Sequence, residues 1–140
     1  MAELTDQIDR AELTALVGRL GRWLDNGDDD ETARRIYHRD AVVHSPRGTA
    51  TGIAEIVAYV ARTSDDAERT QHLATDVLVD LDGDRADVTA NLLVAFFPSG
   101  QTFPSALRLV GLRYAFGALR TAEGWRFTRA DVTPLWRQEP

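Results

Sequence analysis

The sequence predicts an α+β fold: a cone in which three N-terminal helices pack on a curved antiparallel sheet and enclose an apolar pocket. Apolar residues recur at helical spacing up to about residue 60, and at every second position from residue 73 onward. Turn sequences such as Asp82-Gly83 separate the later segments, as in hairpins. Because helices precede strands, we expect two layers in one domain, residues 1–140.

Three segments carry the helical spacing. The first helix is expected over residues 6–25, where the apolar residues are Leu13, Leu16, Val17, Leu20 and Leu24. The acidic run at residues 28–31 favours the start of a second helix, which runs to about Tyr37. After a short strand at residues 41–44, a third helix is expected around residues 53–60.

Four long strands follow. Their approximate bounds are 73–81, 86–97, 105–120 and 125–132, and the tail after residue 134 is expected to be extended. The second half of the strand at 86–97 is apolar on both faces, which predicts that both faces are covered.

The composition excludes several chemistries. The 140 residues include no cysteine and no lysine, which rules out disulfides, thiolate catalysis and lysine Schiff bases. A net charge of −6 without a basic stripe argues against nucleic-acid binding, and the absence of a long apolar run argues against a membrane-spanning segment. The sequence contains no close pair of histidines of the kind that binds a metal ion, so we expect neither a metal site nor a cofactor. An acidic N-terminus without a signal sequence predicts a cytoplasmic protein.

His72 and Asp25 are the candidate acid–base pair. An imidazole at His72 suits a general base, and a carboxylate at the end of the first helix would orient it. Gly21 and Gly18 lie one and two turns before Asp25 on the same side, which leaves room for close approach. The alternatives are a half-buried histidine bonded to backbone and a solvated aspartate beside a turn.

Other residues are candidates for the pocket. His44, which shares a strand face with Val42, is a possible second proton donor, or else a histidine on a surface edge strand. Tyr114 offers a hydroxyl, or else packs in the core. The expected apolar lining comprises Val42, Leu93, Phe97, Val110, Leu112 and Phe116.

Several segments together resemble the SnoaL-like branch of the NTF2-like superfamily. They cover about residues 5–132: Trp23-Leu24-Asp25-Asn26-Gly27-Asp28, Asp40-Ala41-Val42-Val43, Gly52-Ile53-Ala54-Glu55-Ile56, Thr70-Gln71-His72-Leu73-Ala74-Thr75-Asp76-Val77, Val79-Asp80-Leu81-Asp82-Gly83-Asp84-Arg85-Ala86 and Glu123-Gly124-Trp125-Arg126-Phe127. The resemblance implies the cone fold. It does not by itself fix one activity, because this fold carries many.

Within that branch, the stretch around His72 and the helix-terminal Asp25 are similar to those of scytalone dehydratases, whose aspartate and histidine form a hydrogen-bonded dyad. The resemblance places His44 at the position of a catalytic tyrosine of those enzymes. Leu24 lies at the position of a second tyrosine, one residue before the aspartate. It implies a cofactor-independent dehydratase, cyclase or isomerase that acts on a small, apolar polyketide- or steroid-like substrate. For His72 to face the pocket together with Val79, the strand between them must contain a bulge or be buried on both faces.

Two other functions remain open. The same fold serves non-catalytic small-molecule-binding or assembly modules, and epoxide hydrolases that would here use Arg85, Asp87 and Asp131. Exposed apolar residues such as Trp136 predict a homodimer or homotrimer.

Overall fold

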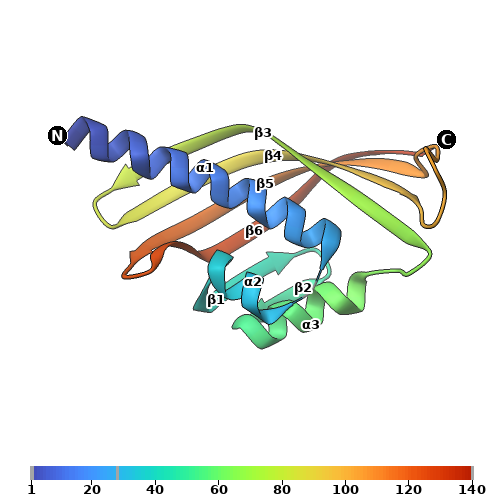
Figure 1. The fold of residues 1–140 in the computed structure, drawn as a ribbon, viewed down its shortest axis with the longest axis horizontal. Coiled ribbons are helices and arrows are strands. Elements are labelled where there is room, and N and C mark those ends of the chain that lie inside the picture. The colour runs from blue at the N-terminus through green and yellow to red at the C-terminus, as the bar shows by residue number, and fades with distance from the viewer. Residues whose placement is uncertain (1, 28, 140) are drawn as a thin grey trace.

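The structure, a computed structural model, describes residues 2–27 and 29–139. These residues form the helices α1 (Ala2–Asn26), α2 (Asp30–Ile36) and α3 (Ile53–Thr63). The strands are β1 (Tyr37–Ser45), β2 (Gly48–Thr51), β3 (Glu68–Asp82), β4 (Arg85–Pro98), β5 (Arg108–Thr121) and β6 (Gly124–Gln138). The predicted α+β class is confirmed, with α1 crossing one face of the long strands (Figure 1).

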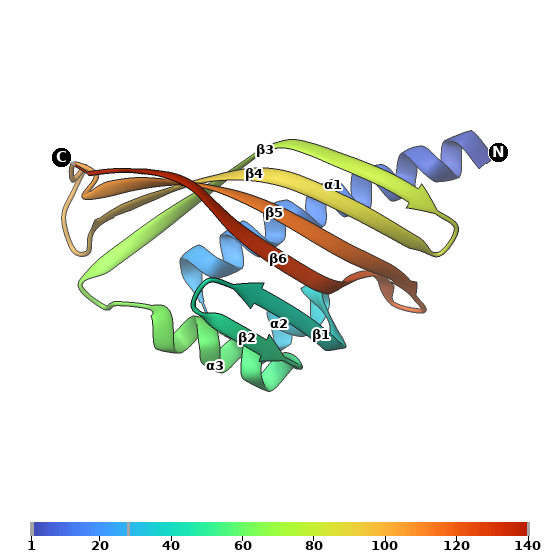
Figure 2. The same ribbon diagram turned by 180° about the vertical axis from the view of Figure 1, so that it is seen from behind.

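The strands form one sheet in the order β2-β1-β6-β5-β4-β3. The four long strands pair antiparallel as expected, whereas β1 pairs parallel with β6, so the sheet is mixed rather than purely antiparallel. Strand β2, which the sequence did not predict, pairs with β1 through a tight turn at Pro46 and Arg47. Seen from behind, β1 and β2 continue the sheet beyond β6 (Figure 2).

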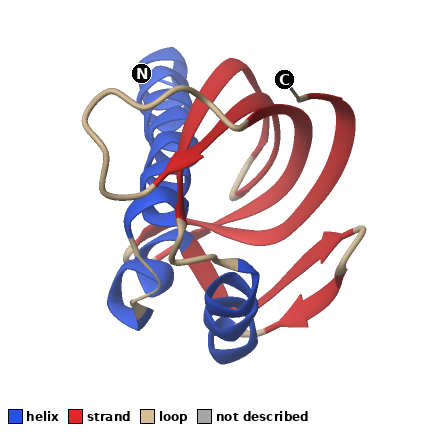
Figure 3. Cartoon of the chain, turned by 90° about the vertical axis from the view of Figure 1, so that its right-hand side faces the viewer, coloured by secondary structure: helices blue, strands red, loops and turns tan. Residues whose placement is uncertain are grey.

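The core lies between α1 and one face of the sheet, which we call the helix-covered face. The apolar stripe of α1 is fully buried there, with Leu13, Val17 and Leu20 all at 0% exposure. Some inward side chains of β4 and β5, such as Val88 and Phe116, are equally inaccessible. The long strands curve strongly (Figure 3), so the far half of this face extends beyond α1.

A bulge in β3 reverses which side chains face inward. The register with β4 shifts between Thr75 and Leu78, and Asp76 lies there with a φ of 51°. Asp76 is held by a hydrogen bond of 3.0 Å from the Asn91 side-chain amide. Before the bulge even-numbered residues face inward, and after it odd-numbered ones do. Of the two arrangements expected from the sequence, a bulge or burial of both faces, the bulge is present, and His72 and Val79 share the helix-covered face.

On the outer face, Trp136 lies half-exposed with its ring over Gly111. The indole ring can lie this close to the backbone of β5 because Gly111 has no side chain. The structure describes a single chain, so the homodimer or homotrimer stays a prediction.

A buried ion pair ties the first half of α1 to the sheet. Both carboxylate oxygens of Asp9 accept hydrogen bonds from Arg120, at 2.7 and 2.8 Å, and the indole of Trp125 donates to the same carboxylate at 3.1 Å. Arg120 also lies over the ring of Trp125 and bonds to exposed Asp84. The hydrogen bonds from Arg120 hold the pKa of Asp9 below its usual value, although burial opposes them.

Replacing Asp9 by asparagine should destabilise the protein by about 1–2 kcal/mol near neutral pH, because the buried carboxylate loses its charge-assisted bonds to Arg120, whose 36% exposed side chain remains screened by water. A lowered folded-state pKa stabilises the fold above the unfolded carboxyl pKa of about 3.9, and this contribution disappears as the pH falls further. The difference between wild type and Asp9→Asn should therefore shrink below about pH 4. Urea unfolding at a series of pH values measures it.

Asp84→Asn is the matched control, because this exposed carboxylate bonds to the same arginine. We expect a change of at most about 1 kcal/mol. Equal losses in the two variants would show that burial of the Asp9–Arg120 pair is not what stabilises this end of α1.

Candidate active site

Asp25 and His72 meet where the last turn of α1 crosses β3. The Nδ1 atom of His72 lies 2.6 Å from Oδ1 of Asp25. The two side chains are 11% and 14% exposed, so most of this contact is shielded from water. The sequence placed these residues 47 positions apart, and the fold brings them into a hydrogen-bonded pair.

Asp25 has further donors that fix the carboxylate in place. The hydroxyl of Thr70 donates to Oδ1 at 2.9 Å, and the backbone N–H of His72 lies 3.1 Å from both oxygens. A carboxylate accepts only, so Nδ1 of His72 carries the hydrogen and donates it.

That tautomer leaves the lone pair of the neutral ring on Nε2, the atom that could accept a proton. No protein group in the described chain bonds to Nε2. No buried side-chain nitrogen or oxygen of the described residues is both sealed from solvent and unpaired, so Nε2 borders open space. The ring is therefore oriented by one nitrogen and accessible at the other, as a general base requires.

Gly21 allows the close approach of α1 and β3. A Cβ atom built on Gly21 would lie 3.3 Å from Cβ of His72 and 3.7 Å from its backbone oxygen. Gly18, one turn earlier, has nothing within 4 Å of a Cβ at the same position. Of the two glycines noted in the sequence, Gly21 is therefore the one that brings the strand close to Asp25.

A hollow of about 420 Å³ adjoins the pair, between the end of α1 and the first residues of β3. Its lining is mostly polar and includes Arg22, Asn26, Arg69 and Gln71. Phe97 also borders it, with Arg69 over its ring. A wholly apolar surrounding for the pair was predicted, and on this side of the site that prediction is wrong.

The apolar side of the candidate site is formed by the helix-covered face of the sheet. Cross-strand pairs place Val110 beside Val94, which is the neighbour of His72, and Leu112 and Tyr114 follow along β5. Phe116 lies deeper and is fully buried. These four residues of β5 project to the same face as His72.

Three predicted pocket residues lie elsewhere. Leu93 is the neighbour of Leu73 on the outer face of the sheet. In β1 the residue that faces inward is Val43, beside Ala130, so Val42 and His44 project outward. His44 is exposed, and its Nδ1 lies 3.0 Å from the Thr49 hydroxyl. The expectation that Val42 and His44 face the pocket is wrong because the pairing of β1 with β6 sets the opposite register. Leu93 faces outward because it alternates with the buried Leu92 and Val94 along β4.

The residues considered for epoxide hydrolysis are not gathered in a cavity. Arg85 and Asp87 are exposed at the start of β4. Asp131 lies on β6 with its carboxylate 3.0 Å from Arg129. This arrangement does not support that alternative.

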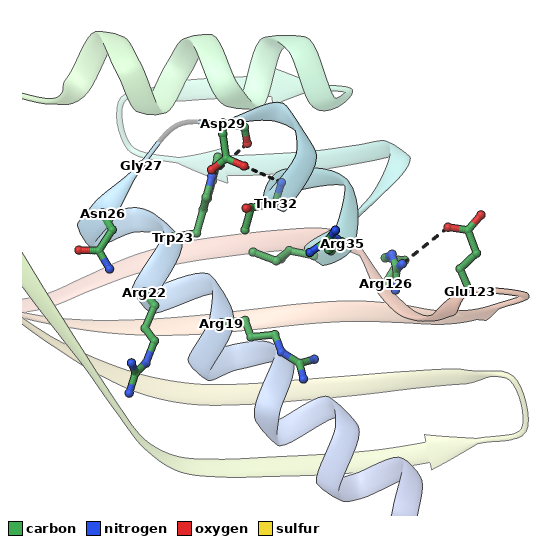
Figure 4. Close-up of a pocket in the computed structure, with 11 residues that line it drawn as sticks. Arg19, Arg22, Trp23, Asn26, Gly27, Asp29, Thr32, Arg35, Glu123 and Arg126 are labelled. Carbon is green, nitrogen blue, oxygen red and sulfur yellow. Dashed lines mark hydrogen bonds and ion pairs between the residues drawn. The ribbon is translucent and has the colours of Figure 1, made fainter.

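A second, larger hollow of about 620 Å³ lies between α1, α2 and the turn from β5 to β6. The side chains of Arg19, Arg35 and Arg126 surround it (Figure 4). At its edge Asp29 caps α2 by accepting a hydrogen bond of 2.8 Å from the Thr32 backbone, as the acidic run predicted. Neither Asp25 nor His72 lines this hollow.

Two polar residues near the site were not predicted. Thr70 belongs to the quoted sequence stretch, and its place two residues before His72 on the same strand face was a usable signal. Tyr37 was expected to be buried at the end of the second helix, and it is buried, although it begins β1. Tyr59 packs against the core from α3, which was not predicted. In the described part of the chain no cluster of three metal-binding side chains occurs. No described helix is long and apolar enough to cross a membrane.

The sequence profile of the SnoaL-like domain matches residues 6–131, so the chain belongs to the SnoaL-like family. No curated protein matches its sequence. Among solved structures, a protein of Kribbella flavida is 24% identical, with a TM-score of 0.81 and 95% of each chain covered.

Two further structures show the same fold at lower identity. A type 2 hexachlorocyclohexane dehydrochlorinase is 15% identical, with a TM-score of 0.83 over 99% of this chain and 93% of that one. A putative scytalone dehydratase from Novosphingobium aromaticivorans is 15% identical, with a TM-score of 0.81 over 100% and 92% of the two chains. These similarities establish the NTF2-like fold.

The two glycines of α1 give a matched test of the close approach. Gly18→Ala should stabilise the protein by about 0.5–1 kcal/mol, because alanine favours the helix and meets nothing there. Gly21→Ala should lose that gain or destabilise the protein, since the new methyl group presses on His72. Urea unfolding compares the two. An equal gain in both variants would show that β3 does not need this close contact.

Proposed function

We propose that this protein is a cofactor-independent acid–base enzyme, a lyase or isomerase in which His72 removes a proton from carbon and Asp25 holds the imidazole. The single observation that carries the proposal is the contact of 2.6 Å between Nδ1 of His72 and the Asp25 carboxylate, with Nε2 left free. The substrate is a small, largely apolar polyketide- or steroid-like molecule with an acidic C–H next to a carbonyl group.

The geometry supports both the acceptance of the proton by His72 and the stabilisation of the charge that the ring then carries. Nε2 of His72 accepts the proton from the substrate carbon, and the ring becomes an imidazolium whose charge the adjacent Asp25 carboxylate stabilises. Positioned general acid–base groups accelerate such steps by about 10²–10⁴-fold. The activated C–H of a carbonyl compound lies within the range of this catalysis.

The same imidazolium is the group available to return the proton. The other two histidines use Nδ1 in contacts within the β1–β2 region, His38 with the Asp40 backbone and His44 with Thr49. His72 would therefore protonate the leaving hydroxyl in a dehydration, or the new carbon position in an isomerisation. The structurally similar proteins whose names include dehydratase and dehydrochlorinase support an elimination.

The apolar surface next to His72 supports an apolar substrate. Val110, Leu112 and Val132 are only partly buried by the protein itself. A bound apolar molecule would cover them, and covering apolar area is favourable by roughly 25 cal/mol per Å².

The proton-abstraction step can be tested without the natural substrate. 2-Tetralone, a bicyclic ketone, has an acidic C–H between its carbonyl group and its aromatic ring, and its exchange with D₂O can be followed by NMR. We expect the wild-type protein to accelerate this exchange and His72→Ala to lose about 100-fold or more of the acceleration. Asp25→Asn should give a smaller loss, because the ring remains but is no longer held.

His44→Ala is the control, since this histidine lies on the outer face and its loss should leave exchange unchanged. Full exchange by His72→Ala would disprove the mechanism. A wild-type protein that binds 2-tetralone without accelerating its exchange would instead indicate the non-catalytic binding module.

A further inference from the structure

We infer that the larger hollow, between α1, α2 and the turn from β5 to β6, is a binding site for a small organic molecule that carries two or more phosphate or carboxylate groups. The hollow has a volume of about 620 Å³. Neither Asp25 nor His72 lines it. The inference therefore goes beyond the proposed function and does not rest on it.

Positive charge predominates in the lining of this hollow. The charged side chains that line it are four arginines and two carboxylates: Arg19, Arg22, Arg35, Arg126, Asp29 and Glu123. The Asp29 carboxylate is occupied in capping α2, and the Glu123 side chain is 87% exposed to water. The chain as a whole has a net charge of −6, so the excess of positive charge here is local. A concave surface lined mainly by one sign of charge attracts ligands of the opposite sign.

Two of the arginines have no counterion. Neither Arg19 nor Arg22 makes a hydrogen bond or an ion pair within the part of the chain that the structure describes. Asp25, three residues after Arg22, is already engaged by donors of β3. The positions three and four residues away from Arg19 hold no acid; they are Ala15, Leu16, Arg22 and Trp23.

Helix stability does not explain this pair of arginines either. The last turn of α1, where the helix dipole favours cations, contains no basic residue, so Arg19 and Arg22 lie before it. Like charges one turn apart oppose helix formation. The two arginines therefore indicate a role other than stabilising α1.

Arg126 presents a guanidinium group that is fixed before any ligand binds. Its Nε and Nη1 atoms donate to the backbone oxygens of Arg34 and Trp125, both at 2.9 Å, and its side chain is 15% exposed. Nη2 makes no hydrogen bond, since the Glu123 carboxylate lies 3.9 Å away. A donor that is already held in place loses little conformational freedom when it binds an anion.

Arg35 contributes a third guanidinium from α2. It pairs with Glu31 at 2.8 Å, but the two side chains are 69% and 78% exposed. Exposed pairs of this kind contribute little stability, so Arg35 can exchange this partner for a ligand. In Figure 4 the guanidinium ends of Arg35 and Arg126 point toward each other, while Arg22 points away from them. Arg22 also lines the smaller hollow.

The size and chemistry of the hollow define the class of ligand. Guanidinium groups bind phosphate and carboxylate groups through paired N–H donors. A volume of about 620 Å³ lies within the range of about 300–1,000 Å³ for small-molecule pockets, and one phosphate group fills only part of it. The arginines come from α1 on one side and from α2 and β6 on the other, which favours a ligand with two anionic groups.

The test titrates the wild-type protein with pyrophosphate and with citrate by calorimetry at low ionic strength. We expect at least one of the two to bind, and the tighter ligand identifies phosphate or carboxylate as the preferred group. Inorganic phosphate, which offers a single group, should bind about tenfold more weakly than pyrophosphate. Added sodium chloride should weaken the binding, because it screens exposed charges.

Substitutions at the hollow identify the residues that bind. Arg19→Gln, Arg35→Gln and Arg126→Gln should each weaken binding by about fivefold or more. Arg19→Gln should unfold at the same urea concentration as the wild type or a higher one, because Arg19 has no partner in the described structure. Arg47→Gln is the matched control, since it removes one positive charge from the exposed turn between β1 and β2 and should leave binding unchanged.

The tryptophans report where the anion binds. The indole N–H of Trp23, which lines the hollow, donates to the backbone oxygen of Asp29 at 3.2 Å. Its NMR signal should shift when the anion is added, whereas the signal of Trp136, on the outer face of the sheet, should not.

Failure of both pyrophosphate and citrate to bind would overturn the inference, as would binding that Arg19→Gln and Arg35→Gln leave unchanged. Equal affinity for phosphate and pyrophosphate would overturn the assignment of two anionic groups. His72→Ala should bind the anions as the wild type does, because His72 does not line this hollow. The outcome is therefore independent of the proton-exchange experiment that tests the proposed function.

Discussion

The contact between Asp25 and His72 is the interaction on which the proposed chemistry depends, and it imposes conditions on three elements. Helix α1 must end with its carboxylate over β3, and Gly21 must leave room for the strand. The bulge at Asp76 must turn His72 to the helix-covered face, because an uninterrupted strand would direct either His72 or the core residue Val79 outward. Each condition is local, yet all three must hold together.

Helix α1 is fixed to the sheet by a carboxylate near each end. Asp9 and Asp25 are 16 residues apart, or about 24 Å along the helix. Asp9 accepts from Arg120 and Trp125, while Asp25 accepts from Thr70 and His72 and in the proposed function orients the imidazole. The attachment of the first half of the helix to the sheet helps to fix where its last turn, with Asp25, lies.

The interior combines groups that stabilise the fold with groups that do not. The Asp9 carboxylate and the Tyr59 hydroxyl have protein partners, whereas Nε2 of His72 and the hydroxyls of Tyr37 and Tyr114 have none in the described structure. Unpaired polar groups in a core reduce stability, and proteins retain them where function needs them.

The sequence by itself indicated the layers, the long strands and the candidates Asp25 and His72, because hydrophobic periodicity and short motifs are local signals. It required a bulge or burial of both faces between His72 and Val79 without deciding which. Only the tertiary structure decided which faces meet. The parallel pairing of β1 with β6 sends Val42 and His44 outward, since a shift of one residue exchanges the two faces of a strand. The tertiary structure also brings Tyr37 and Tyr114 into one aromatic cluster, although they are 77 residues apart in the sequence. No local sequence pattern predicts this proximity.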